Sequence, residues 1–141
     1  MTYVLDSSVA LKWVMVEADS TKAIRLRDDF LNGFHELIAP DLFLPEVANG
    51  LASAERQGRI GAGEAIASFL DIVRTAPDLH ASRPHLARAI PLAIAHRRAV
   101  YDFTYLALAE AEGCEFITAD DQFARGLRTT FPFIRLLNQL P

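Results

Sequence analysis

The chain opens with Met1-Thr2-Tyr3-Val4-Leu5-Asp6-Ser7-Ser8, a short apolar run that ends at a carboxylate and two hydroxyls. The run Tyr3-Val4-Leu5 favours a β-strand, and a helical pattern begins at Val9. In open α/β sheets, ligands bind beyond the carboxyl ends of the strands. We therefore predict that Asp6 lies at the edge of a sheet where chemistry is normally placed.

The rest of the chain alternates helical patterns with short apolar runs. Predicted helices cover residues 8–16, 19–31, 42–58, 64–75, 82–97, 103–112 and 122–127, and predicted strands cover 37–39, 79–81, 114–118 and 133–137. Pro91 is expected to kink or interrupt the fifth helix. Strands that alternate with helices predict a parallel sheet, and the absence of repeats and linkers predicts a single domain over residues 1–141.

The patterns also predict which side chains are buried and which cap the helices. The first helix is expected to be capped by Ser7 or Ser8, and Asp41 is expected to cap the third. The buried faces should contain Val9, Trp13 and Val16 in the first helix and Ile66, Phe69, Leu70 and Val73 in the fourth. The segment Gly61-Ala62-Gly63 follows a polar helix end, so we interpret it as a connection between helices and not as a dinucleotide fingerprint.

Composition and charge limit the classes of function. The 141 residues carry a net charge of −4, which argues against a broad electrostatic clamp on nucleic acid. No stretch is apolar enough for a membrane span or a secretory signal, and a single cysteine, Cys114, agrees with a reducing compartment, so we expect a cytoplasmic protein. The basic clusters could contact RNA backbone or form solvated faces; they contain Arg97, Arg98, Arg125 and Arg128.

Four acids occupy corresponding places in the predicted fold. Asp6 and Asp120 end strands, while Glu46 and Asp102 lie early in helices that begin near the same edge of the sheet. Each acid alone could be a turn residue, a helix cap or a first-turn acid that matches the helix dipole. Together they would repel one another unless a divalent cation were present, and carboxylates suit Mg²⁺ or Mn²⁺ better than zinc.

Four blocks of sequence carry a family resemblance. They are Val4-Leu5-Asp6-Ser7-Ser8-Val9-Ala10-Leu11-Lys12-Trp13, Pro45-Glu46-Val47-Ala48-Asn49, Tyr101-Asp102-Phe103-Thr104-Tyr105-Leu106-Ala107-Leu108-Ala109 and Thr118-Ala119-Asp120-Asp121-Gln122-Phe123. In this order they resemble the signature blocks of PIN-domain ribonucleases, and most closely those of VapC-type toxins of type II toxin–antitoxin pairs. The resemblance implies a three-layer α/β/α fold with a central, mostly parallel sheet of four to five strands.

The resemblance also implies a function and a set of site residues. The function is that of a metal-dependent endoribonuclease using Mg²⁺ or Mn²⁺, with Asp6, Glu46, Asp102 and Asp120 in the four acidic places. The hydroxyls of Ser7, Ser8 and Thr118 match positions that hold a water or orient a carboxylate, and Asp121 is either a supporting group or a helix cap. Implied partners are a cognate VapB-type antitoxin, a second copy of the chain, and unpaired RNA such as a tRNA or rRNA loop.

Other classes of protein fit the residues less well. Haloacid-dehalogenase phosphatases need a second aspartate where Ser8 stands, and receiver domains need a late lysine, whereas no lysine follows Lys22. No Gly-x-Ser-x-Gly motif supports serine catalysis. A non-catalytic PIN-like scaffold that binds an ion structurally and recruits protein or RNA remains the alternative. The side chains of Trp13, Phe30 and Phe69 could serve a partner surface, but they are equally good core residues.

Overall fold

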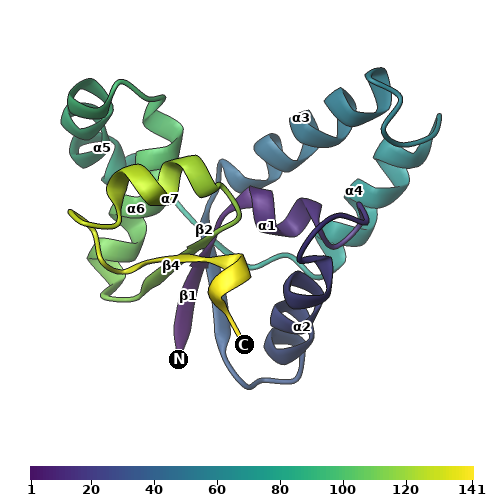
Figure 1. Cartoon of the computed structure of the whole chain (residues 1–141), viewed down its shortest axis with the longest axis horizontal. Helices are drawn as coiled ribbons and strands as arrows, with labels where there is room; N and C mark the ends of the chain where they lie inside the picture. Colours follow the sequence, from purple (N-terminus) through teal and green to yellow (C-terminus); the bar gives the residue numbers. More distant parts are fainter.

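Five short strands form one parallel sheet in the computed structural model, which describes all 141 residues (Figure 1). The strand β1 (Thr2–Leu5) lies at the centre of the order β3-β2-β1-β4-β5. Its neighbours are β2 (Glu36–Pro40) and β4 (Glu115–Thr118), and the edge strands are β3 (Asp78–His80) and β5 (Ile134–Leu136). Because every pair is parallel, all the strands end at the same edge, as predicted.

Helices cover both faces of the sheet. They are α1 (Ser7–Leu11), α2 (Ser20–Leu31), α3 (Phe43–Arg56), α4 (Glu64–Arg74), α5 (Arg83–His96), α6 (Val100–Glu112) and α7 (Asp121–Leu127), followed by a 3₁₀ turn at Leu137–Gln139. Figure 1 shows α1 to α4 gathered on one side of the sheet and α5 to α7 on the other. The predicted three-layer α/β/α fold is confirmed. None of the helices is both long and apolar enough to cross a membrane.

The core is densest where α6 meets the sheet. Seven consecutive residues of this helix, Phe103 to Ala109, are buried against the sheet. The Val4 and Leu5 side chains of β1 are also fully buried, one on each face of the sheet. Burying a large apolar side chain contributes about 1.5–3 kcal/mol, so this contact fixes the helix firmly. Asp102, one residue before the buried run, is therefore held at a defined place beside the strand ends.

The first helix is shorter than predicted. It ends at Leu11, so Val16 lies in the following loop and is 99% exposed, which makes the prediction of a buried Val16 wrong. Trp13 is buried as predicted, and its indole N–H donates to the Ala23 carbonyl oxygen at 3.0 Å. This bond links the turn after α1 to α2. The N-cap position belongs to Asp6, not to either serine.

The prediction for the buried face of α4 is wrong for three of its four residues, and the fourth, Phe69, is partly buried against the core. Ile66, Leu70 and Val73 are 62%, 53% and 43% exposed, and the fully buried residue of this helix is Ile72. The physical reason is that α4 packs on α3, not on the sheet, so only a narrow strip of it is covered. An exposed apolar stripe remains on the outer face of α4.

Two details of the helix ends and interiors differ from expectation. Asp41 does not cap α3; its carboxylate accepts bonds from the Ser82 amide, at 3.2 Å, and from the Ser82 hydroxyl. This contact links the end of β2 to the start of α5. The helix α5 continues through Pro91 without interruption. Proline removes the bond to the Ala87 carbonyl, and because Ala87 is exposed, water can replace it.

Candidate active site

The site begins where two neighbouring strands end. β1 and β4 pair in register, with Leu5 opposite Ile117, and the Asp6 amide continues the ladder by donating to the Ile117 carbonyl oxygen at 3.0 Å. The residues that follow β4 are therefore brought directly beside Asp6. This is the juxtaposition of strand-ending acids that the alternating pattern predicts.

Hydroxyls hold the Asp6 carboxylate in one orientation. Ser8 Oγ and Thr118 Oγ1 each donate to Asp6 Oδ2 at 2.7 Å, while Oδ1 accepts no hydrogen bond. The same two hydroxyls accept from the amides of Ala119 and Asp120, both at 3.0 Å. Ser8 and Thr118 thus fasten the end of β4 to the end of β1 and leave one oxygen of Asp6 free.

The environment of Asp6 disfavours its charge. Burial is the largest cause and raises its pKa to about 6; the bonds from Ser8 and Thr118 oppose the shift, and the charges of Asp102 and Asp120 add to it. An acid with this pKa is still largely ionised at neutral pH, but at a cost. A cation beside Asp6 would relieve that cost.

Glu46 reaches the same place from the first turn of α3. Ser7 Oγ donates to Glu46 Oε1 at 3.4 Å. Burial raises the Glu46 pKa to about 7; the nearby Tyr105 hydroxyl lowers it, and the charges of Asp6 and Asp102 raise it further. The sequence pattern did not single out Tyr105, whose side chain is 1% exposed. Because Tyr105 lies in a run of buried residues of α6, the sequence pattern indicated only a core residue.

The positively charged side chain of Arg98 lies near both Asp102 and Asp120. Arg98 Nη1 lies 3.5 Å from Asp102 Oδ2 and 3.9 Å from Asp120 Oδ2, and the guanidinium lies over the Phe123 ring, 5.1 Å from its centroid. Burial raises the Asp102 pKa, and Arg98 opposes that shift. The other oxygen of Asp120 accepts from the Phe123 amide at 3.0 Å and so caps α7.

The remaining predicted residues lie around this cluster. Arg97 ends α5 and is exposed, and Arg128 ends α7 and is exposed. Arg125 pairs with Asp121 along the surface of α7, at 2.7 Å. Asp121 is the first residue of that helix, whereas the capping oxygen comes from Asp120. Asp121 therefore makes its ion pair within its own helix.

The donor set suits a hard divalent cation. All the available groups are carboxylate and hydroxyl oxygens, the Asp6 and Glu46 carboxylates both have raised pKa values, and Asp6 Oδ1 is free. In the present side-chain arrangement, no three acid, histidine or cysteine groups are close enough to share one ion. The residues thus fit the chemistry of Mg²⁺ or Mn²⁺ in kind, and the acids would have to draw together to hold it.

A groove extends from the acids along α3. Its volume is about 440 Å³, and it is lined by Ser7, Leu42, Pro45, Glu46, Asn49, Gly50 and Tyr101. Gly50 allows α1 to approach α3, because a Cβ atom at this position would lie 2.9 Å from Leu11 Cδ1. The groove therefore has a wall from α3 and a second wall from the start of α6.

Comparison with known proteins identifies relatives of this chain. The family model for the PIN domain matches residues 3–126. Ribonuclease VapC3 of Pyrobaculum aerophilum is 32% identical over 126 residues, which cover 88% of this chain and 93% of the relative.

Two crystal structures share the fold. PAE2754 from Pyrobaculum aerophilum superposes with a TM-score of 0.69 at 21% identity, covering 98% of this chain and 93% of that one. VapBC2 from Rickettsia felis, bound to a DNA fragment from their promoter, gives a TM-score of 0.61 at 15% identity, with 96% and 97% covered. These two likenesses concern the fold.

Proposed function

The chain belongs to the PIN-domain family, in its VapC-type branch, and from this premise we propose that it is a metal-dependent endoribonuclease and the toxin of a toxin–antitoxin pair. We further propose that residues 1–141 act as a single domain. The observation that carries the proposal is that Asp6 lies beside the end of β4, the strand that leads to Asp120, while Arg98 lies near both Asp120 and Asp102 and Ser7 donates to Glu46. The name of the relative, Ribonuclease VapC3, agrees with this activity.

The four acids would hold Mg²⁺ or Mn²⁺, with the oriented Asp6 as the central ligand. When bound, such an ion supplies an activated water and neutralises charge that develops on the phosphate. Ser8 and Thr118 are poor candidates for a nucleophile, because their hydroxyl oxygens already accept hydrogen bonds from the amides of Ala119 and Asp120. Their role is to orient the carboxylates, which suits hydrolysis by water.

The substrate is proposed to be unpaired RNA, such as a loop of a tRNA or an rRNA. Bases are accessible to a protein only where RNA is single-stranded. Arg97, Arg125 and Arg128 are exposed and are candidates for contacts with the RNA backbone. Arg98 is less available for this purpose, because it faces Asp102 and Asp120.

A VapB-type antitoxin and a second copy of the chain are the proposed protein partners. Each needs an apolar surface, and the molecule has two exposed apolar stripes. One is formed on α4 by Ile66, Leu70 and Val73, and the other on α5 by Leu86, Ile90 and Ile94. The spacing of three or four residues places each set on one helical face. These two exposed apolar stripes support the proposal that the protein binds a protein partner.

The decisive experiment compares wild-type protein with Asp6→Asn. We expect brief induction of the wild type to produce new RNA ends at a defined sequence, and the variant to produce none. Purified wild-type protein should cut RNA after Mg²⁺ or Mn²⁺ is added, whereas the variant should lose more than about 100-fold of that rate, since even losing a group that supports a ligand costs ~10–100-fold. Undiminished cleavage by Asp6→Asn would refute the assignment; thermal stabilisation by metal without any cleavage would favour the scaffold.

A further inference from the structure

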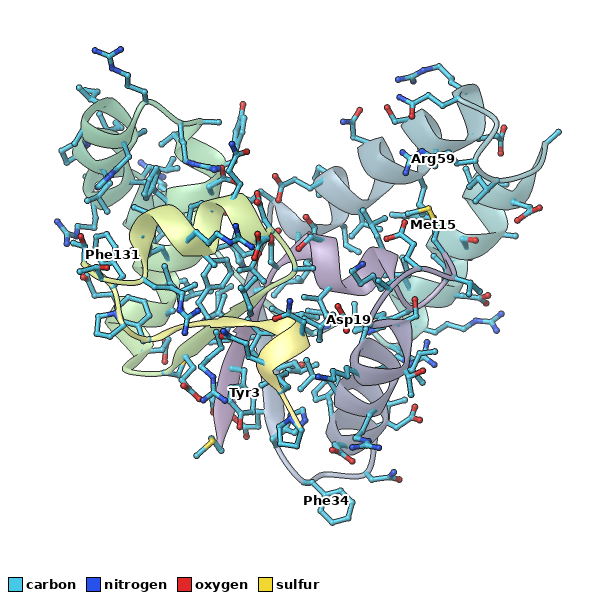
Figure 2. All side chains as sticks on the ribbon, in the orientation of Figure 1. Tyr3, Met15, Asp19, Phe34, Arg59 and Phe131 are labelled. Carbon is cyan, nitrogen blue, oxygen red and sulfur yellow. The ribbon has the colours of Figure 1, made fainter.

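Only two aromatic side chains of the molecule are strongly exposed, and they lie in different places. Tyr101 is 58% exposed and lines the groove that contains Glu46, and Phe34 is 74% exposed in the loop between α2 and β2. Figure 2 shows Phe34 at the end of the molecule away from α3. The Tyr101 ring has no aromatic or cationic partner, and its hydroxyl makes no hydrogen bond within the protein. Its free ring borders the proposed reaction centre.

The groove beside Tyr101 has the size and lining of a ligand site. Its volume of about 440 Å³ lies within the ~300–1,000 Å³ of typical small-molecule pockets. Pro45 and Leu42 provide apolar surface, and Asn49 provides an exposed amide with both donors and an acceptor. Glu46, Asn49 and Gly50 are spaced at three and four residues, so they lie on one face of α3.

Electrostatics determine what kind of ligand fits. Glu46 in the groove repels phosphate, as do the acids beyond it, and Arg98 is already paired with Asp102 and Asp120. RNA that reaches these acids therefore needs affinity that does not depend on charge. Stacking of a base on an aromatic ring supplies it, at about 1–3 kcal/mol per base and with little dependence on sequence.

We propose that Tyr101 is the stacking platform of a nucleobase subsite, with Asn49 on the opposite wall contacting the edge of the same unpaired base. This inference rests on the proposed function, because it places the base next to the phosphate that the acids would attack. Tyr101 directly precedes Asp102 in the first turn of α6, so a base stacked on its ring would lie close to an acid of the site. Asn49 follows Glu46 by three residues, so these two side chains share one face of α3.

The test measures binding of RNA without cleavage. All variants carry Asp6→Asn, and a labelled single-stranded RNA of mixed sequence is titrated in buffer with EDTA, with fluorescence anisotropy as the readout. Tyr101→Ala should raise Kd by about 5- to 150-fold, the effect of losing one stacked base. Tyr101→Phe keeps the ring and should bind like the parent. Phe34→Ala, the matched control, removes an equally exposed ring far from the groove and should change nothing.

Several outcomes would overturn the proposal. Unchanged affinity in Tyr101→Ala does so, as does an equal loss in Tyr101→Phe, because the ring would then not be the contact. A change in molecular mass by light scattering without a change in RNA affinity assigns Tyr101 to a protein interface instead. Thermal unfolding of each variant identifies misfolding. The RNA affinity of Asn49→Ala tests the opposite wall of the same subsite.

The two proposals fail in different ways. If the wild type cuts RNA and Tyr101→Ala binds normally, the subsite is wrong and the nuclease stands. If RNA binding depends on Tyr101 but no metal supports cleavage, the subsite stands and the nuclease is wrong. A wild-type protein that binds no RNA at all overturns both.

Discussion

The ends of β1 and β4 follow the same pattern in sequence, yet they give their acids opposite surroundings. Asp6 accepts two hydroxyl bonds and has no cation beside it, whereas Asp120 caps α7 and lies 3.9 Å from Arg98. Accordingly, the Asp6 pKa is raised to about 6 by burial. Acids in equivalent places of a fold can therefore differ in whether the protein supplies a counter-charge. Asp6 lacks one, and Asp120 has one in Arg98.

The largest expected effect is on the pH dependence of stability. The folded-state pKa of Asp6, about 6, lies above its ordinary value of 3.8, so the folded protein holds a proton that the unfolded chain releases. Stability from this group is therefore present below pH 4 and is lost as the pH rises through 6, by roughly 3 kcal/mol in all. Glu46, with a pKa of about 7, extends the loss to higher pH.

Asp6→Asn should remove the loss of stability that accompanies rising pH, and Asp120→Asn should not. In EDTA at pH 7.5, urea unfolding should show Asp6→Asn to be more stable than wild type by up to about 3 kcal/mol, while the two should converge near pH 4. Adding Mg²⁺ should stabilise wild type and leave Asp6→Asn unchanged. Equal effects of the two substitutions would remove the distinction between the strand ends.

Next in size is the effect of removing the bond that links the two strand ends. Thr118→Val takes a donor from Asp6 and an acceptor from the Asp120 amide. We expect a loss of about 1–3 kcal/mol in stability, because buried polar groups are left unpaired, and a ~10–100-fold weaker affinity for Mn²⁺ by calorimetry. Ser7→Ala breaks only the 3.4 Å bond to Glu46 and should cost less. If both variants behave alike, Thr118 does not position Asp6.

A smaller effect is expected at the cation that distinguishes Asp120. Arg98→Gln should lower metal-free stability by about 0.5–1 kcal/mol, the worth of a partly exposed ion pair. It should also tighten Mn²⁺ binding, because Arg98 opposes the rise in the Asp102 pKa and competes with the metal for the same oxygens. Urea unfolding in EDTA measures the stability, and calorimetric titration measures the Mn²⁺ affinity. Weaker Mn²⁺ binding would mean that Arg98 helps the metal instead of competing with it.

The smallest effect belongs to the acid next to Asp120 in sequence. Asp121 pairs with Arg125, whose side chain is 77% exposed, so Asp121→Asn should change stability by less than about 0.5 kcal/mol. Metal affinity and RNA cleavage should stay at wild-type values. Loss of metal binding in this variant would place Asp121 among the ligands and enlarge the site.

Whether the sequence predicts a structural feature depends on how far apart in the chain the interacting residues are. The strands and the position of Asp6 beside the end of β4 were predictable, because parallel strands carry their ends to one edge whatever the details of packing. The exposed face of α4 was not predictable. Amphipathic spacing indicates that a helix face is apolar, but it does not indicate which neighbouring element covers that face. The same applies to Val16, which the turn after Leu11 carries into solvent.

The predicted site was incomplete for a similar reason. Arg98 lies four residues before Asp102, but its contact with Asp120 joins parts of the chain that are distant in sequence. No local pattern reports such a contact. Tyr105 belongs to a run of buried residues in α6, so nothing in the spacing separates it from the core. The main-chain pattern located the acids, and tertiary packing decided what surrounds them.

The close approach at Gly50 has an evolutionary consequence. Any side chain there would meet the end of the Leu11 side chain at 2.9 Å, so the Leu11 side chain would have to move. Natural variation at position 50 should therefore be accompanied by a smaller residue at position 11. These two sites are expected to change as a pair over the history of the lineage, although neither carries a group that takes part in the chemistry.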